Sequence, residues 1–151
     1  MTTDTPGESP EHAASALARE IEFLADPDVA GLGRSLAAVL RGAVDNPTAV
    51  SQAWLRYAQR LAAIPQVVLS NRMGTAATPP MPLNSKDRRF ADRAWSENPA
   101  FYALRMYHQA FAEFVAELVT AAGLERIQET KARLLTALMM DALAPANFLP
   151  A

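Results

Sequence analysis

The chain has 151 residues, of which half are hydrophobic and a fifth are charged, and its formal net charge is −2. This charge excludes an extended basic face, so we expect no binding of nucleic acid, which depends on cations that displace counterions from phosphates. Cysteine is absent, which excludes disulfides, thiolate metal sites and a thiol nucleophile among these residues. Frequent alanine and leucine with only 6 glycines favour helices over strands, and we expect an all-α fold.

The first residues are polar and acidic, and no apolar stretch follows a positive cluster. This composition is not that of a secretory signal, and we expect residues 1–9 to form a disordered arm. Charged residues interrupt every apolar run before it reaches the length of a bilayer, so we expect no membrane span. Together with the absence of cysteine, these features favour a cytoplasmic location.

Two helices are expected before residue 45. Ser9 is followed by a proline and a glutamate, the order typical of a helix start, and apolar residues then recur at helical spacing over about residues 10–25. A short second helix is expected over 34–41, after an Asp-Pro pair and two glycines that interrupt the pattern. With the helix that follows, we assign residues 10–69 to a set of N-terminal helices.

A third helix is expected to open at Asn46-Pro47, because apolar residues then alternate four and three apart along one face. Pro65 lacks the N–H that a helix interior needs and clashes with the preceding turn, so we expect the helix to stop or kink near Ile64. Residues 70–85 contain three prolines and small polar residues without periodicity, which predicts an extended connector.

Residues 86–149 are expected to contain a helical hairpin. The hairpin is preceded, within this range, by a short irregular segment that Phe90 and Trp95 anchor to the surface. Its first helix opens at Asn98-Pro99 and ends at Gly123, a residue suited to a helix C-terminus. The second helix has a charged first half and an apolar second half, and we expect the apolar half to be buried. Its buried residues should be Leu134, Leu135, Leu138, Met139 and Leu143.

Few side chains offer chemistry. The chain has two histidines, His12 and His108, and we interpret His108 as a core or interface histidine bonded to a neighbour. Glu113 and Glu117 lie one turn apart, a spacing compatible with paired carboxylates, but a solvated helix face is the favoured interpretation. We therefore predict no catalytic, metal-binding or cofactor-binding residues and no cofactor.

Two charged features favour structural ion pairs. Asp141 is expected in the last turn of a helix, where the dipole disfavours an acid, so a basic or amide partner is expected. Arg126 and Arg133 are candidates that only folding could bring to it. The basic cluster of Lys86, Arg88, Arg89 and Arg93 has acids interleaved with it, and local ion pairing is favoured over a phosphate site, for example for coenzyme A.

Two motifs stand out in residues 84–149. Asp87, Arg89, Phe90, Trp95 and Pro99 form an Asp-x-Arg-Phe…Trp…Pro pattern, and Asp141, Pro145, Asn147 and Phe148 form a closing pattern. Both resemble the amino-terminal region of bacterial poly(3-hydroxyalkanoate) synthases, in which serine is common at the position of Ala144. The resemblance covers residues 84–149 well and 46–69 loosely. It implies a place before an α/β-hydrolase domain whose catalytic cysteine, with aspartate and histidine, polymerises 3-hydroxyacyl groups from coenzyme A thioesters.

None of those catalytic residues can be assigned here, so we expect this chain alone not to be an enzyme. The resemblance implies a non-catalytic domain that supports dimerisation, contacts the catalytic acyltransferase domain and associates with polyester granules. Its partners would be a synthase catalytic domain or a second copy of the chain, with the granule surface or phasins as further partners. The alternative is an independent, phasin-like helical coat or interaction protein, whose amphipathic helices lie on the polymer.

Overall fold

The computed structural model describes residues 29–75, 77–83 and 87–149. It divides into two compact units, Met1–Arg34 and Ser35–Ala151. The expected arm over 1–9 and the expected helix over 10–25 lie outside the described residues. The all-α prediction is confirmed, and the described helices are α2 (Val29–Asp45), α3 (Pro47–Arg72), η1 (Arg88–Phe90), α4 (Ala94–Glu97), α5 (Pro99–Ala121), α6 (Arg126–Ala142) and η2 (Pro145–Asn147).

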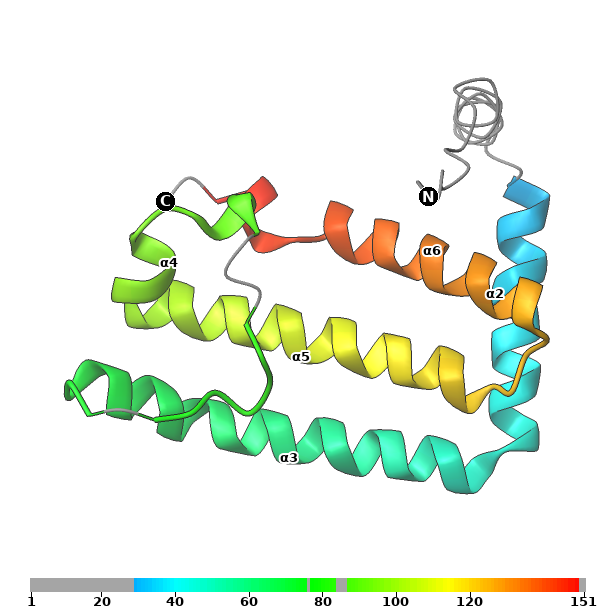
Figure 1. The fold of residues 1–151 in the computed structure, drawn as a ribbon, viewed down its shortest axis with the longest axis horizontal. Helices are drawn as coiled ribbons and strands as arrows, with labels where there is room; N and C mark the ends of the chain where they lie inside the picture. Colours follow the sequence, from blue (N-terminus) through cyan, green and yellow to red (C-terminus); the bar gives the residue numbers. More distant parts are fainter. Residues whose placement is uncertain (1–28, 76, 84–86, 150–151) are drawn as a thin grey trace, which may run out of the picture. The chain divides into compact units, whose positions relative to one another are not determined.

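Helix α5 is the central element of the second unit. Figure 1 shows α5 between α3 and α6, and each of these two helices packs along one side of it. The core between α3 and α5 is formed by Ile64, Val67, Met106 and Ala110, all buried. A smaller core lies at the amino-terminal end of α5, where α4 and η2 pack against it.

The helix was expected to stop or kink near Ile64, and a stop is wrong, because α3 continues through Pro65 to Arg72. Proline inside a helix removes one hydrogen bond and costs about 3 kcal/mol. Ile64 and Val67, on either side of the proline, are both buried against α5, whereas Pro65 itself is exposed. Burial of the flanking turns therefore offsets the local loss, and the proline ring faces solvent.

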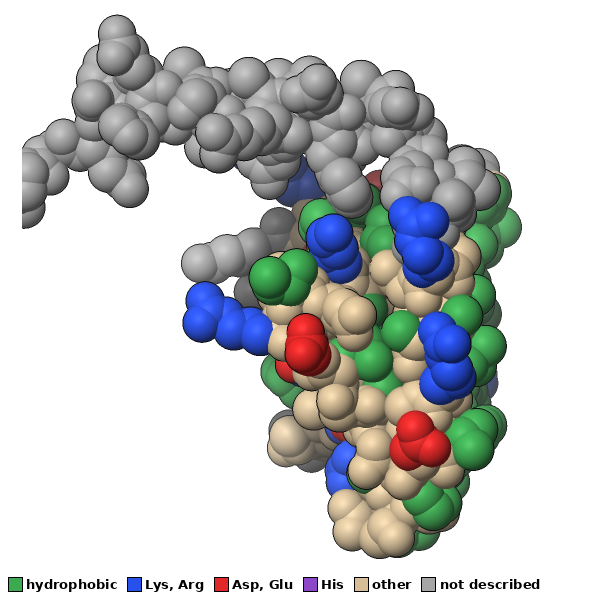
Figure 2. Space-filling view, turned by 90° about the vertical axis from the view of Figure 1, so that its right-hand side faces the viewer, with side chains coloured by type: hydrophobic (Ala, Val, Ile, Leu, Met, Phe, Trp, Pro, Cys, Tyr) green, Lys and Arg blue, Asp and Glu red, His purple; other side chains and the backbone are tan. Residues whose placement is uncertain are grey.

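Helix α2 is longer than the predicted segment 34–41 and approaches the end of α5 closely. A Cβ added at Gly42 would lie 2.1 Å from the Ala122 carbonyl oxygen, so only glycine fits at this contact. Asn46 donates to the Gly42 carbonyl oxygen both from its side chain (3.0 Å) and from its backbone N–H (3.1 Å), and so closes the end of α2. Figure 2 shows the side that carries α2, where hydrophobic side chains gather along one edge and charged ones are scattered.

The predicted ends of α5 are confirmed. The side chain of Asn98 accepts from the backbone N–H groups of Ala100 (2.9 Å) and Phe101 (3.4 Å), which are unpaired donors at a helix start. Pro99 occupies the first turn, where its missing N–H is not needed. Gly123 follows the helix with φ of 61°, a left-handed conformation that glycine adopts without strain.

The predicted burial of the apolar half of α6 is wrong for most of its residues. Only Ala132 and Met140 of α6 are buried. Leu134 and Leu138 stay substantially exposed because they lie on the side of α6 opposite its two buried residues. The exposed residues are Ile127, Leu134, Leu138, Met139 and Leu143.

The segment 77–83 carries neither helix nor strand, as the sequence predicts for a connector. It is nonetheless anchored, because Met81 is buried with Ile64 and Met106 and Leu83 packs beside it. Ser35–Ala151 forms one compact unit, which contains residues 70–85. The domain boundary placed at residues 70–85 stays a prediction. No helix in the described part of the chain is long and apolar enough to cross a membrane.

Candidate functional site

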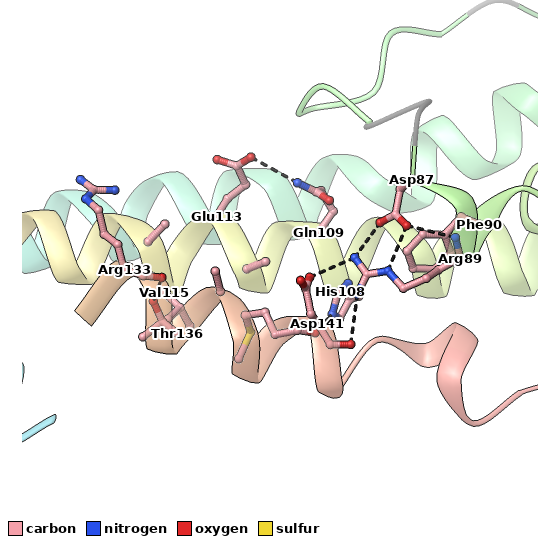
Figure 3. A pocket seen from close by; sticks show the side chains of 14 residues that line it. Asp87, Arg89, Phe90, His108, Gln109, Glu113, Val115, Arg133, Thr136 and Asp141 are labelled. Carbon is pink, nitrogen blue, oxygen red and sulfur yellow. Dashed lines mark hydrogen bonds and ion pairs between the residues drawn. The ribbon is translucent and has the colours of Figure 1, made fainter. Parts of the chain in front are cut away.

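An open groove of about 430 Å³ runs between α5 and α6 and is closed at one end by η1. It brings together polar side chains that are far apart in sequence, as Figure 3 shows. Its floor is made of small or flexible apolar residues, and its rim is charged. The residues that line it are Asp87, Arg89, Phe90, His108, Gln109, Ala112, Glu113, Val115, Ala116, Arg133, Thr136, Ala137, Met140 and Asp141.

Arg89 is the centre of the charged end of the groove. Its Nε donates to Asp87 Oδ1 (2.9 Å) and its Nη2 to Asp87 Oδ2 (2.7 Å), the two parallel bonds that only a guanidinium can make. Asp87 also caps η1, because its Oδ1 accepts from the Arg89 backbone N–H. The hydrogen bonds from Arg89 hold the pKa of the Asp87 carboxyl below its ordinary value, although partial burial opposes this shift.

The same guanidinium reaches across the groove to the end of α6. Arg89 Nη2 lies 3.0 Å from Asp141 Oδ1, and Nη1 donates to the Asp141 carbonyl oxygen (3.1 Å). Asn147 donates to that carbonyl (2.8 Å) and to the carbonyl of Ala142 (3.1 Å). Two side chains thus pair carbonyls that the helix end leaves free, and Arg89 offsets the unfavourable position of an acid there.

We call these four residues, Asp87, Arg89, Asp141 and Asn147, the clasp. The expected basic partner of Asp141 is confirmed, but it is Arg89 and not Arg126 or Arg133. Sequence reasoning missed this pairing because Arg89 was assigned to a local cluster 52 residues away. The signal that could have revealed the pairing is that Asp87 and Arg89 belong to one motif, and Asp141 and Asn147 to the other.

Beneath the clasp lies the small core. Trp95 is 1% exposed, and its ring meets that of Phe90 edge to face, with centroids 5.0 Å apart. Ala144 is fully buried against these two rings, and the guanidinium of Arg105 lies 5.1 Å from the centre of the Phe90 ring. The predicted anchoring of this segment by Phe90 and Trp95 is confirmed, and the two motifs meet in one cluster.

The remaining motif residues have backbone roles or lie at the surface. Pro99 begins α5 and Pro145 begins η2, both at first-turn positions that suit proline. Phe148 lies at the surface and is 68% exposed. The helical turn of η2 directs its side chain outward, while Ala144 and Ala146 occupy the contacts with the small core.

The imidazole of His108 is held by a structural partner. Its Nε2 lies 2.9 Å from the carbonyl oxygen of Met140, and because a carbonyl can only accept, Nε2 carries the proton and donates. The ring is half-buried, with its centre 6.3 Å from that of Phe90. The interpretation of His108 as an interface histidine is confirmed, and His12 lies outside the described residues.

Glu113 and Glu117 do not form a carboxylate pair for chemistry. Glu113 accepts from the amide of Gln109 (3.3 Å) in the groove. Glu117 faces α3, where Arg56 donates at 2.9 Å and Arg60 at 2.6 Å. The solvated-face interpretation is wrong for Glu117, whose side chain is 20% exposed because two arginines of another helix cover it. Burial raises the pKa of Glu117, but the bonds from Arg60 and Arg56 outweigh it and leave that pKa below its ordinary value.

The basic cluster is largely used in local pairs, as predicted. Arg89 is held by Asp87, and Arg93 lies 3.3 Å from Glu97, one turn away. Asp92 caps α4 by accepting from the Ala94 N–H (2.8 Å). Lys86 lies outside the described residues. The pairing leaves Arg89 and Arg93 committed within the chain instead of free to hold a phosphate.

The groove therefore contains acids and an imidazole, but its geometry is structural. Asp87 and Asp141 share Arg89, Glu113 is bonded to Gln109, and His108 donates to a main-chain carbonyl. Within the described ranges, no three histidine, cysteine, aspartate or glutamate side chains gather where they could hold a metal ion. What this arrangement can do is fix η1, α5 and the end of α6 to one another.

Comparisons with known proteins agree with the two motifs. Residues 86–151 match the family model described as "Poly-beta-hydroxybutyrate polymerase (PhaC) N-terminus". The chain is 28% identical over 116 residues to the poly(3-hydroxyalkanoate) polymerase of Methylorubrum extorquens, a match that covers 76% of this chain and 19% of that protein. It is 32% identical over 97 residues to a poly(3-hydroxyalkanoate) polymerase subunit of Rhizobium etli, covering 64% of this chain and 14% of that subunit. No solved structure matches the chain.

Residues 86–151, which contain the clasp, are thus similar to the N-terminal region of polyhydroxyalkanoate synthases, which confirms the resemblance seen in the sequence. The match spans less than a fifth of the length of these relatives.

Proposed function

We propose that this chain acts as a non-catalytic N-terminal domain of a polyhydroxyalkanoate synthase. In this role it contacts the catalytic acyltransferase domain, supports dimerisation and helps to associate the synthase with polyester granules. The observation that carries the proposal is the clasp, because the residues of both family motifs meet there in one structural unit. Motif residues that orient helices and cap a helix end serve to hold a shape that another surface recognises.

The chemistry of the groove supports a binding role. Each titratable side chain that lines the groove is bonded within the chain. None of the described hydroxyls is hydrogen-bonded to His108, whose Nε2–H donates to the Met140 carbonyl oxygen. A nucleophile needs an adjacent base that is free to take its proton. The exposed apolar side chains of α6 also suit contact with a further surface.

The first experiment measures turnover by the chain alone. Purified chain is incubated with 3-hydroxybutyryl coenzyme A, and release of coenzyme A is followed with a thiol reagent. We expect no release above the uncatalysed rate. Release that scales with the chain concentration and is lost in His108→Gln would contradict the proposal.

The second experiment measures association. We expect the chain to bind the Rhizobium etli polymerase subunit from which the matched N-terminal stretch has been deleted. A granule-coat protein would instead sediment with polyester granules in cells that lack any synthase. Sedimentation without a synthase, combined with no binding to the truncated subunit, would support the alternative phasin-like role.

A further inference from the structure

Helix α6 presents large apolar side chains to solvent on the side turned away from α5. Ile127, Leu134 and Leu138 recur seven and four residues apart and are 72%, 45% and 44% exposed. At 3.6 residues per turn they share one stripe, which lies opposite Ala132 and Met140, the two buried residues of the helix. Met139 and Leu143 are also exposed, but the same spacing places them on another side of the helix. We call Ile127, Leu134 and Leu138 the α6 apolar face.

The polarity of α6 is reversed relative to an ordinary surface helix. Its ion pair, Arg133 with Glu129, lies toward α5, and Arg133 also donates to Thr120 of α5 (2.7 Å). Thr136 lines the groove between the two helices. A surface helix normally turns its apolar stripe inward and its charges outward. In the isolated chain the exposed leucines contribute no burial energy, and burying one would contribute about 1.5–3 kcal/mol.

The position of the face within the chain indicates what covers it. It lies within residues 86–151, the part that matches the polymerase N-terminus. In the relatives the matched stretch makes up 14–19% of the protein, and the family description places it at the N-terminus, so most of the relative's chain follows it. Leu149, the last described residue, lies just beyond η2, which the clasp holds at the end of α6. The larger part of a polymerase therefore follows on the stretch that carries the α6 apolar face.

The charges of the face favour a protein over a lipid surface. Lys131 is the only charged residue between Ile127, Leu134 and Leu138 on this stripe, whereas helices that lie on membranes carry several cations beside their apolar side. We propose that the α6 apolar face docks against the larger part of a polymerase, the part that follows the matched stretch in the relatives. This inference rests on the proposed function and assigns its contact surface.

Carbene footprinting of the complete chain tests this inference. The chain is labelled alone and with an excess of the Rhizobium etli polymerase subunit that lacks its matched stretch. We expect labelling of the peptides that contain Leu134 and Leu138 to fall at least fivefold on addition of the truncated subunit. We also expect Leu134→Gln combined with Leu138→Gln to weaken binding at least tenfold, because the contact depends on apolar burial.

The matched control is Leu36→Gln combined with Leu40→Gln. These α2 residues are 57% and 60% exposed and lie outside residues 86–151, so we expect a change in binding of no more than twofold. All substituted side chains are substantially exposed, and equal thermal unfolding by circular dichroism would show that both double variants fold.

Each other outcome overturns the inference. Binding of the truncated subunit with unchanged labelling of α6 would refute the assigned surface and leave the proposed function standing. Failure of the truncated subunit to bind would refute both. Protection of α6 by self-association of the chain would assign the face to a second copy, and protection by phosphatidylcholine and phosphatidylglycerol vesicles would assign it to lipid.

Discussion

Arg89 lies 3.0 Å from Asp141 and bonds the carboxylate and the main-chain carbonyl of that residue with one guanidinium. The contact joins η1 to the end of α6 across 52 residues of sequence. It also orients the turn that Asn147 caps, so one planar cation determines how the last described residues leave the helix layer.

Arg89→Lys should destabilise the chain by about 1–2 kcal/mol. Lysine keeps the charge but cannot make the fork on Asp87 while reaching Asp141, and the partly exposed pairs are worth less than buried ones. The free energy of unfolding from urea titration is the measurement. Arg93→Lys is the control, since the Arg93–Glu97 pair is largely exposed and should change stability by less than about 0.5 kcal/mol. Equal effects of the two substitutions would show that the clasp adds nothing beyond a surface pair.

Gly42→Ala should lower the free energy of unfolding, whereas Gly33→Ala should raise it. At Gly42 the new methyl group would meet the Ala122 carbonyl at 2.1 Å and force α2 away from α5, which costs about 1–3 kcal/mol. At Gly33 nothing lies within 4 Å, so alanine should stabilise the helix by about 0.5–1 kcal/mol. Thermal unfolding compares the two variants, and a neutral Gly42→Ala would contradict the close approach.

Trp95→Ala should be the most destabilising single change considered, by about 3–5 kcal/mol. The side chain is almost completely buried and contacts Phe90, Phe101 and Ala144, so truncation leaves a cavity that rigid helices cannot fill. Guanidinium titration followed by circular dichroism gives the loss. Phe148→Ala, at an exposed motif position, should stay within about 0.5 kcal/mol of the wild type. A mild effect of Trp95→Ala would mean that the small core contributes little to folding.

Stability should decrease as the pH falls through the titration range of Glu117. Its folded-state pKa lies below the ordinary value of 4.5, so the ionised carboxylate contributes stability that is complete above the unfolded pKa. That contribution is lost as the pH falls through the folded pKa. Glu117→Gln should therefore be less stable at neutral pH and show a shallower loss between about pH 6 and about pH 3.

The control for this pH dependence is Glu113→Gln, whose carboxylate is bonded to an amide and not to arginines. It should leave the pH profile of unfolding close to that of the wild type. The pKa of Asp87 is lowered as well, by Arg89, so the stability of both variants should still decrease at low pH. Identical profiles for wild type and Glu117→Gln would exclude the two-arginine contact as a source of stability.

The start and end of α5 were predictable because they depend on local chemistry. Asn98, Pro99 and Gly123 mark α5 through backbone preferences that no distant residue alters. The course of α3 through Pro65 was not predictable, because the burial that stabilises it comes from α5, some forty residues later. Local rules identified a proline penalty but could not weigh it against tertiary packing.

The residues of the candidate site were predictable from the sequence, but the contacts among them were not. The motifs singled out Asp87, Arg89, Asp141 and Asn147, but the sequence could not show that they form one clasp. The burial of α6 was wrongly predicted because periodicity identifies an apolar stripe without showing which side faces the core. Glu117 was missed as a half-buried ion-pair residue because its partners, Arg56 and Arg60, lie on another helix.

The central place of α5 has a consequence for the dynamics of the described helices. Since α3 and α6 each pack on α5, neither can keep its buried contacts if α5 opens. Amide protons in the middle of α5 should therefore exchange with deuterated solvent only through global unfolding. Those in the first turn of α6, where Glu125 makes no side-chain cap hydrogen bond, should exchange through local opening. Such a gradient would let the outer helices adjust to a bound surface while the middle of the domain keeps its shape.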